Sequence, residues 1–254
     1  MDDQNASIRV LDRAFAILMY MADEKRPVGV TEIAVATGLP KATVYRILSS
    51  LENIRAVVTK GREYAIGPTM LLFADAYRVR TVISEVARPL LLELRDETKE
   101  TVHLFVFERG ELFYLDKLES PFQVRMHSRV GVRGSLTNLS AGKAILALLS
   151  PEDCRGLSET LHPELLSELR DVRSRGYAVD DEQNEAGLRC VGAAVTDELG
   201  RPIGAVSVSA PVYRFPSSMV QERGERVRAV ALAITEKLVD FERVPMPVPV
   251  RAQR

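Results

Sequence analysis

Cysteine and tryptophan are scarce in this sequence: its 254 residues include no tryptophan, and its two cysteines are Cys154 and Cys190. Because these lie far apart and form no C-x-x-C pair, we expect neither a disulfide framework nor a cysteine zinc site, and the thiols should stay reduced. The three histidines lack metal-ligand spacing as well: His103, His127 and His162. The sequence therefore predicts no metal and no other cofactor.

Long apolar runs and an excess of one charge are also missing. No stretch approaches the roughly 20 apolar residues of a membrane helix, and "MDDQNASIRV" lacks the basic start and apolar stretch of a signal peptide. We therefore expect a cytoplasmic protein without membrane contact. The formal net charge of −1 does not by itself indicate a nucleic-acid partner, so any basic surface has to be local. A hydrophobic content of 46% is enough for one large domain or two smaller ones.

Apolar residues repeat with the period of a helix near the N-terminus. A first helix, over about residues 8–24, is predicted by apolar side chains spaced three and four apart: Leu11, Phe15, Leu18 and Met21. A short second helix follows in "VTEIAVATGLP", where Thr31 can cap the start, Glu32 suits the first turn and Gly38 permits a sharp exit. A third helix, in "GLPKATVYRILSSLE" (38–52), is predicted to pack through Val44, Ile47, Leu48 and Leu51.

The third helix has a polar start, and a basic hairpin follows it. The segment "AVVTKGREYAI" alternates β-branched and aromatic residues around a Lys60–Gly61 turn, which is typical of a β-hairpin. Residues 41–62 carry five basic side chains against Glu52 alone, a local excess of +4. Two helices joined by a glycine turn, with a hairpin as a wing, are the arrangement that places a recognition helix in the major groove of DNA.

The residue types on this surface suit contacts to double-stranded DNA. Arg46 can bind guanine through two hydrogen bonds, Thr43 and Tyr45 can reach base edges or phosphates, and lysines neutralise phosphates. The predicted DNA-binding residues are Thr31, Lys41, Thr43, Tyr45, Arg46, Lys60 and Arg62. The alternative is an ordinary three-helix module whose polar face is solvated or contacts another protein.

A connector separates this part from the rest of the chain. Residues 67–78, "GPTMLLFADAYR", are predicted to form a helix that leaves the wing, and the domain boundary is expected near residue 79. This gives a winged helix-turn-helix domain with its linker helix over 1–78 and a second domain over 79–254. A helix from about 82 to 97 should end or kink at Pro89, and the tail "VPMPVPVRAQR" is expected to be a loose terminus.

The second domain mixes helices with strands. Paired strands flank the turn "ERGE", and further strands are predicted over 177–179, 188–196 and 203–210. Helices are predicted in "AGKAILALL", in "PELLSELRDVRSRG" and over about 218–241, the last packing through Val227, Val230, Ile234, Leu238 and Phe241. Strands with segregated helices favour an α+β sensor domain, with an antiparallel sheet flanked by helices, over a parallel α/β fold.

Small polar groups converge on one side of this predicted sheet. If Asp197 pairs with Pro202 across the turn, Cys190 lies opposite Ser209 and Gly192 opposite Ser207. Asp180 opens an acidic loop after a strand, and the amides of Ser140 and Ala141 can begin the helix in "LSAGKAILALL". Together these groups suit a small carboxylate, with Ser140 and Ala141 meeting its charge and Asp180, Cys190, Ser207 and Ser209 meeting its hydroxyls or carbonyls.

Plainer interpretations of these residues stay open. Ser140 could be a helix cap, Cys190 a small buried apolar residue, and the serines hydroxyls satisfied by backbone. "TNLSAGKA" is not a phosphate-binding loop, because Thr137 and Ala144 stand where a glycine and a Ser or Thr are required. A catalytic set of Cys190, His103 and Asp180 can be drawn, but nothing in the sequence places these within hydrogen-bond reach, so an enzyme is not predicted.

Several motifs resemble one known family along nearly the full chain. "IRVLDRAFAIL", "TEIAVATGLPKATVYRIL" and "GREYAIGP" are similar to the DNA-binding half of the IclR family of bacterial transcription regulators. "LSAGKAILA" and "GYAVDDEQNEAGLRCVGAAVTDELGRPIGAVSVSAP" are similar to the family's effector signature. The resemblance implies a winged helix-turn-helix, a GAF-like effector domain and a ligand carboxylate held by the amides of Ser140 and Ala141. It also implies effector contacts from Asp180, Cys190, Ser207 and Ser209.

The resemblance indicates the fold more specifically than it indicates the chemical identity of the effector. This chain has Thr137 and Ser140 where family members often have His and then Gly or Ala. The segment "ETVHLFVFERGELFYLDKLESPFQVRMHSRVG" is similar to KdgR-type sugar-acid regulators but is shared with members that sense aromatic acids. The resemblance favours a ligand-responsive regulator, in the family's commoner mode a repressor, acting as a homodimer or tetramer on a near-palindromic operator and sensing a sugar acid or another small organic acid.

Overall fold

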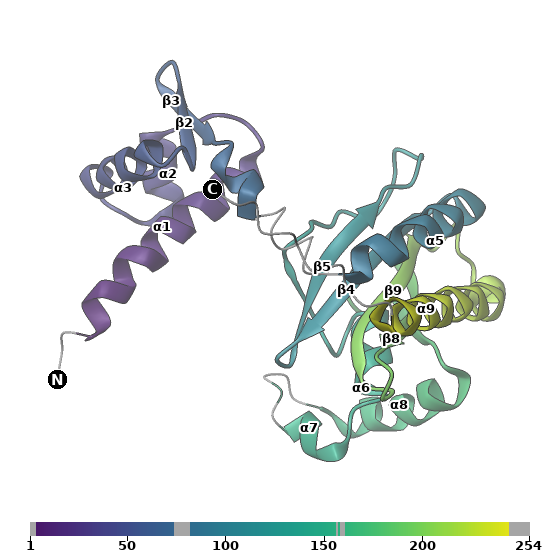
Figure 1. Cartoon of the computed structure of the whole chain (residues 1–254). Coiled ribbons are helices and arrows are strands. Elements are labelled where there is room, and N and C mark those ends of the chain that lie inside the picture. Colours follow the sequence, from purple (N-terminus) through teal and green to yellow (C-terminus); the bar gives the residue numbers. More distant parts are fainter. Residues whose placement is uncertain (1–3, 74–81, 156, 158–160, 244–254) are drawn as a thin grey trace, which may run out of the picture. The chain divides into compact units, whose positions relative to one another are not determined.

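The chain forms two compact units, residues 1–80 and 81–254 (Figure 1). The structure, a computed structural model, describes residues 4–73, 82–155, 157 and 161–243. The expected domain boundary near residue 79, the second half of the predicted 67–78 helix and the C-terminal tail all lie outside these ranges. Of that linker helix, residues 69–73 are helical. The two units are described separately below.

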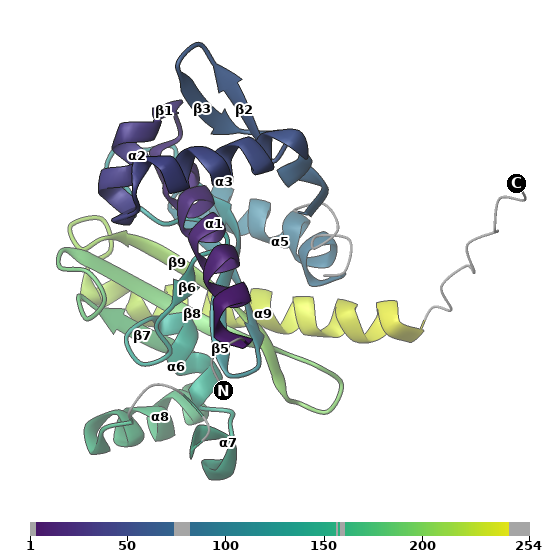
Figure 2. The ribbon, with the colours of Figure 1, turned by 90° about the vertical axis from the view of Figure 1, so that its left-hand side faces the viewer.

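The N-terminal unit is a winged helix-turn-helix. Its elements are α1 (Gln4–Glu24), β1 (Val28–Gly29), α2 (Val30–Thr37), α3 (Lys41–Asn53), β2 (Val57–Lys60) and β3 (Glu63–Ile66). The strands form an antiparallel sheet in the order β1-β3-β2, and the β2–β3 hairpin stands beside α3 (Figure 2). Gly38 ends α2 with a left-handed φ of 68°, which permits the tight turn into α3. The predicted helix-turn-helix and wing are therefore present.

The core of this unit confirms the predicted packing residues of α3 and corrects those of α1. Val44 and Leu48 are fully buried, with Ile47 and Leu51 partly buried against the same cluster. In α1, however, the described side chains that join this core lie in the C-terminal half of the helix: Ile17, Leu18 and Met21. Two residues that the periodicity placed on the same face, Leu11 and Phe15, are 61% and 60% exposed. The reason is that α1, with 21 residues, is longer than α2 and α3, with 8 and 13 residues, so Leu11 and Phe15 lie beyond the core that these helices form.

Two local predictions in this unit were wrong. Thr31 does not cap α2, because the helix begins at Val30 directly after β1, and its N-cap residue is Gly29. The hairpin turn is Gly61–Arg62 rather than Lys60–Gly61, because Lys60 pairs with Glu63 across the turn. The φ of 67° at Gly61 explains why glycine stands there.

The C-terminal unit is built on a curled antiparallel sheet of six described strands. Their order is β6-β5-β4-β9-β8-β7, with bounds β4 (Thr101–Glu108), β5 (Glu111–Leu118), β6 (Arg133–Gly134), β7 (Ala178–Asp181), β8 (Leu188–Thr196) and β9 (Pro202–Pro211). The helices are α5 (Val82–Thr98), α6 (Ser140–Leu146), α7 (Pro151–Arg155), α8 (Pro163–Arg175) and α9 (Val220–Arg243), the last preceded by a 3-10 turn (Ser217–Met219). The α+β class is confirmed, while α7 and β6 were not predicted.

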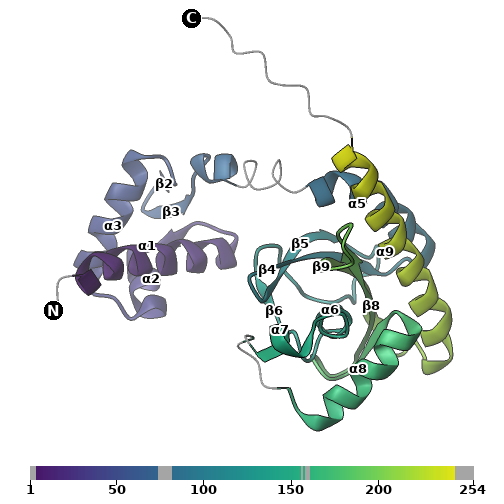
Figure 3. The same ribbon diagram turned by 60° about the horizontal axis from the view of Figure 1, so that its bottom comes forward.

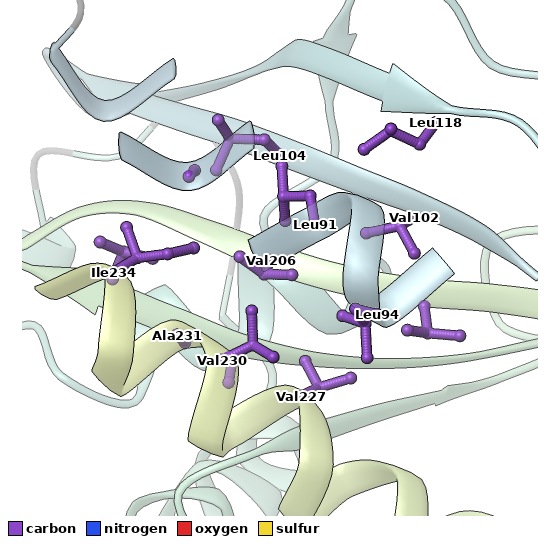
Figure 4. Packing of buried hydrophobic residues seen from close by; sticks show 14 of the residues in the cluster. Leu91, Leu94, Val102, Leu104, Leu118, Val206, Val227, Val230, Ala231 and Ile234 are labelled. Carbon is purple, nitrogen blue, oxygen red and sulfur yellow. The ribbon is translucent and has the colours of Figure 1, made fainter. Parts of the chain in front are cut away.

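The helices lie on opposite faces of this sheet. In Figure 3, α6 is seen end-on inside the curl, whereas α5 and α9 lie outside it. The outer core packs Leu91 and Leu94 of α5 and Val230 and Ile234 of α9 against Val206 and its neighbours (Figure 4). The inner cluster joins side chains of the sheet, α6 and α8: Phe105, Leu112, Tyr114, Ala178, Ala205, Ala141, Ala144, Ile145, Leu169 and Val172. The inner face therefore carries both the apolar residues under α6 and the polar residues discussed below.

The register of the last hairpin confirms the predicted pairings. Cys190 lies opposite Ser209 and Gly192 opposite Ser207. A bulge between Val195 and Thr196 shifts the end of the hairpin, so that Pro202 pairs with Thr196 rather than with Asp197.

Two predictions for the helices of this unit can be compared with the structure. The helix α5 does not end at Pro89 but continues to Thr98. In α9 the predicted packing residues Val227, Val230, Ile234 and Leu238 are buried, and the side chain of Phe241 lies outside the described part.

Candidate functional site

Polar residues line up across four neighbouring strands on the inner face of the sheet. One cross-strand row runs from Asp180 on β7 through Cys190 on β8 to Ser209 on β9. The adjacent row runs from Gly192 on β8 through Ser207 on β9 to His103 on β4. Since alternate residues of a strand share a face, both rows point to the same side. All the polar members of the two rows are buried.

The N-terminus of α6 lies directly on these rows because Gly192 has no side chain. A Cβ added at Gly192 would lie 2.7 Å from the amide nitrogen of Ala141, 2.8 Å from the carbonyl carbon of Ser140 and 2.9 Å from its Oγ. The first backbone amides of a helix have no partner within the helix. The amides of Ser140 and Ala141, both buried residues, are thus brought beside the polar rows.

A small cavity lies where these groups meet. The space between them, counted with its opening to solvent, is about 170 Å³. Its lining joins the predicted residues to an aromatic and apolar wall: Ser140, Ala141, Cys190, Ser207, Ser209, His103, Phe105, Tyr114, Met126 and Leu139. A ligand at this position would contact the start of α6, the two serines and the aromatic wall together.

Asp180 lies behind the cavity and contacts it through Cys190. The Asp180 carboxylate accepts hydrogen bonds from the amides of Gln183, at 2.9 Å, and Asn184, at 3.2 Å. Burial raises the pKa of Asp180, and these two amides oppose the shift. Burial also raises the pKa of the Cys190 thiol, and the neighbouring Asp180 charge adds to the increase. Cys190 is therefore held as a neutral thiol.

Lys143, which the sequence reasoning missed, fixes the loop that follows Asp180. It lies in α6 with a fully buried side chain, and its Nζ donates to Glu168 Oε1 at 2.7 Å and Gln183 Oε1 at 2.5 Å. Gln183 in turn donates its amide to Asp180. The sequence signal that could have revealed Lys143 is its position inside the otherwise apolar helix "AGKAILALL".

His103 is the second residue whose role in the site was missed. Its Nε2 lies 2.7 Å from Ser128 Oγ, while its buried Nδ1 has no hydrogen-bond partner among the described residues. Its ring packs edge-on against Tyr114, with 5.3 Å between ring centroids. The catalytic set of Cys190, His103 and Asp180 is not assembled in this arrangement. The imidazole bonds Ser128 rather than Asp180, and the raised pKa of the Cys190 thiol disfavours a nucleophilic thiolate.

Burial of His103 is expected to weaken the fold in acid. Burial lowers the pKa of His103 from 6.5 to about 3, and the like charge of Lys117 contributes. Between these two pH values the unfolded chain binds the additional proton, so the free energy of unfolding falls as the pH drops from about 6.5 towards 3. Urea titrations at pH 7 and pH 4.5 should therefore show a smaller acid-induced loss of stability for His103→Gln than for the unmodified chain.

Exposed His127 provides the matched control for this experiment. His127→Gln should lose as much stability in acid as the unmodified chain does. Equal losses in His103→Gln and the unmodified chain would show that the buried imidazole contributes nothing to the pH dependence.

The predicted DNA-binding residues lie on α3, on the hairpin and at the start of α2. Lys41, Tyr45 and Arg46 are exposed on α3, and Thr43 is half-buried there. Lys60 and Arg62 are exposed around the hairpin turn, and Thr31 is exposed in the first turn of α2. Within the described ranges, none of the four basic side chains forms an ion pair. Their charges are therefore available to phosphates.

Metal and membrane sites find no support in the parts of the chain that the structure describes. His, Cys, Asp and Glu side chains there do not gather in groups of three or more that could hold a metal ion. Each helix within the same ranges is too short or too polar to span a bilayer.

Comparisons with known proteins match both units to one family. Residues 10–61 match the description "IclR helix-turn-helix domain", and residues 76–236 match "Bacterial transcriptional regulator IclR C-terminal". The HTH-type transcriptional regulator KdgR of Escherichia coli is 30% identical over 252 residues, covering 94% of this chain and 95% of that protein. The transcriptional repressor IclR of the same organism is 30% identical over 245 residues, covering 90% and 89%.

A solved structure agrees with these sequence matches. The crystal structure of Thermotoga maritima IclR matches with a TM-score of 0.77 and 30% sequence identity, covering 91% of this chain and 99% of that one.

Proposed function

Because the chain belongs to the IclR family, and is thus a DNA-binding transcriptional regulator with an effector-binding C-terminal domain, we propose that it is a repressor released by a small organic acid such as a sugar acid. The observation that carries the proposal is the cavity where the first amides of α6 meet two rows of buried polar side chains. The relatives are regulators, and we propose no catalytic role for this chain. A cytoplasmic location follows from action on DNA.

In the proposed site, the carboxylate of the effector binds the backbone amides of Ser140 and Ala141. Hydroxyl or carbonyl groups of the effector bind Cys190, Ser207 and Ser209 in the lining of the cavity, and Asp180 lies behind Cys190. Uncharged donors in a water-excluding pocket can hold a carboxylate because each hydrogen bond to a charged group contributes about 1.5–3 kcal/mol. Phe105 and Tyr114, which also line the cavity, supply an apolar wall for the rest of the effector.

We propose that α3 enters the major groove and that the β2–β3 hairpin follows the adjacent backbone. Arg46 then reads a base, and Thr43 and Tyr45 reach base edges or phosphates. Lys41, Lys60, Arg62 and Thr31 contact phosphates. Support comes from the exposure of these side chains, apart from half-buried Thr43, and from the local excess of basic residues. The competing proposal, a winged unit that binds protein, predicts no salt-dependent affinity for DNA.

Substitutions of two basic residues should separate base reading from phosphate contact. We expect Arg46→Ala to weaken binding to the specific operator by about 1–3 kcal/mol and to relax sequence preference. Lys60→Ala should instead weaken binding to all sequences and reduce the slope of log K against log salt by about 1. Fluorescence anisotropy with labelled DNA from upstream of the protein's own gene, at several salt concentrations, measures both quantities.

A charge removed from the other unit, Arg170→Ala, serves as the control and should leave both quantities unchanged. Unaltered specificity in Arg46→Ala together with an unaltered salt slope in Lys60→Ala would refute this binding mode.

We propose that the protein binds its operator as a homodimer, or as a tetramer of two dimers. A near-palindromic operator presents two half-sites, which a twofold-symmetric dimer matches. The N-terminal unit carries apolar side chains that its own core does not cover, namely Val10, Leu11, Phe15 and Met19 on α1 and Leu71, Leu72 and Phe73 after the hairpin. Such an exposed apolar surface suits contact with a second copy.

Effector binding would act through the lining of the cavity. Large side chains in this lining, Phe105, Tyr114 and Met126 among them, can take up different positions with and without a bound acid. The chain then has two arrangements with different affinities for the acid. A ligand shifts DNA affinity only through such a difference, typically by 5- to 150-fold.

A further inference from the structure

His103 occupies a central position on the inner face of the sheet. It is the third residue of β4, is fully buried, and lies directly opposite Ser207 in the β4–β9 ladder. It lines the same cavity as Ser140, Ala141 and the two serines. An imidazole is therefore placed among the groups proposed to hold the effector.

One nitrogen of this imidazole is bonded and the other is not. Nε2 lies 2.7 Å from Ser128 Oγ, and the ring is held between Tyr114, at 5.3 Å, and Phe105, at 5.9 Å between centroids. Nδ1 is buried and has no hydrogen-bond partner among the described residues. A buried polar atom without a partner costs about 1–3 kcal/mol, so its presence in a native site requires a reason. A hydrogen bond from a ligand in the cavity would supply that partner.

We infer that Nδ1 of His103 hydrogen-bonds a hydroxyl or carbonyl group of the effector and thereby selects hydroxy or keto acids over acids that lack such a group. The inference rests on the proposed function of the cavity as an effector site. The Ser128 hydroxyl can donate to or accept from Nε2, so Nδ1 can be an acceptor or a donor. A hydroxyl group fits either case, and a carbonyl fits the donor case. An acid without a hydroxyl or carbonyl group would leave Nδ1 of His103 unpaired in the complex. The site should therefore bind such an acid much more weakly.

Two substitutions of His103 each replace one of its ring nitrogens and remove the other. Together they distinguish a contact between Nδ1 and the ligand from a purely structural role of the bond to Ser128. In His103→Gln the terminal amide can replace Nε2 and keep the bond to Ser128, but the Nδ1 group is lost. In His103→Asn the shorter amide lies near the Nδ1 position, and the bond to Ser128 is lost. Ser128→Ala removes the same bond while it leaves His103 unchanged. A ligand contact predicts that His103→Gln is the most damaged of the three, whereas a structural role predicts that it is the least damaged.

The test measures operator affinity of the full-length protein by anisotropy with pyruvate, lactate, gluconate and propionate as probes. We expect at least one of the first three acids to shift the affinity and propionate to shift it at least tenfold less effectively. His103→Gln should need at least tenfold more acid, while His103→Asn and Ser128→Ala stay within a few fold of the unmodified protein. If His103→Gln responds normally, or propionate acts as well as its hydroxy and keto analogues, the inference is overturned and the pocket proposal stands. If no acid shifts the affinity, both are overturned.

A measurement on the unmodified protein covers the case in which His103→Gln does not fold. With three histidines in the chain, ¹⁵N-histidine NMR can resolve each ring. Adding the active acid should move the Nδ1 resonance of His103 and leave that of exposed His127 in place. An Nδ1 resonance that stays fixed at saturating acid would overturn the contact.

Discussion

Gly192→Ala is expected to abolish the response to the effector while the protein still binds its operator. The added methyl would lie 2.7 Å from the amide nitrogen of Ala141 and 2.8 Å from the carbonyl carbon of Ser140. Both are backbone atoms, so the start of α6 has to move away from the sheet, and the amides proposed to bind the carboxylate move with it. We expect at least a tenfold loss of acid sensitivity and a decrease of about 1–3 kcal/mol in the free energy of unfolding, as for other overpacked sites.

Operator titrations with acid, together with urea unfolding, measure the two effects of Gly192→Ala. Gly29→Ala makes the same chemical change at a glycine with no atom within 4 Å of its added Cβ. Because Gly29 is the N-cap of α2, where Ala is disfavoured, it should cost about 1 kcal/mol or less, and it should leave the acid sensitivity unchanged. The close approach of α6 to β8 would have no functional importance if Gly192→Ala kept the acid sensitivity of the unmodified protein.

Lys143→Ala is expected to destabilise the C-terminal unit by about 3 kcal/mol. Its Nζ bonds Glu168 and Gln183, and its side chain is fully buried in α6. Removing one partner of a buried ion pair costs about 3–5 kcal/mol, and the value here should lie near the lower end because the Glu168 side chain is 30% exposed. The loop that carries Gln183 would also lose its attachment to α6. We therefore expect Lys143→Ala to reduce acid sensitivity as well as stability.

Urea unfolding of the C-terminal unit, followed by circular dichroism, tests this expectation. Lys143→Met keeps most of the buried volume and should lose less stability than Lys143→Ala. The difference between the two variants measures the cost of the empty space left by alanine, and the loss in Lys143→Met measures the cost of the lost hydrogen bonds. Glu164→Gln removes an exposed carboxylate from the same helix as Glu168 and should be nearly neutral. A change below about 0.5 kcal/mol in Lys143→Ala would mean that the Lys143 network does not support the fold.

The elements of both units could be predicted from the sequence wherever periodicity and turn chemistry agreed. The pairing of Cys190 with Ser209 is one example, because strong strand patterns flank a short polar turn and leave one register that buries the apolar face. Packing beyond a single element was less predictable. Leu11 and Phe15 share a helical face with Leu18, but their exposure depends on how far α2 and α3 reach along α1. The periodicity of the α1 sequence cannot predict how far the other two helices extend along it.

The predicted pocket residues Ser140, Ala141, Cys190, Ser207 and Ser209 line one cavity, but the sequence did not reveal its remaining polar groups. His103 stands in a strand, where alternation alone cannot say whether a histidine meets solvent, backbone or a ligand. Only the three-dimensional structure shows that its Nδ1 has no hydrogen-bond partner among the described residues. Lys143 was missed for a similar reason, because its partners lie 25 and 40 residues away along the chain. Long-range contacts of polar groups require the fold.

The central claim is that an acid in the inner cavity controls the affinity of the winged unit for DNA. The most direct test compares the unmodified protein with a Ser207→Ala, Ser209→Ala double variant in operator titrations, with and without the active acid. We predict equal operator affinity without acid, a shift of 5- to 150-fold by acid in the unmodified protein, and little or no shift in the variant. An equal acid-induced shift in both proteins would place the effector elsewhere and contradict the claim.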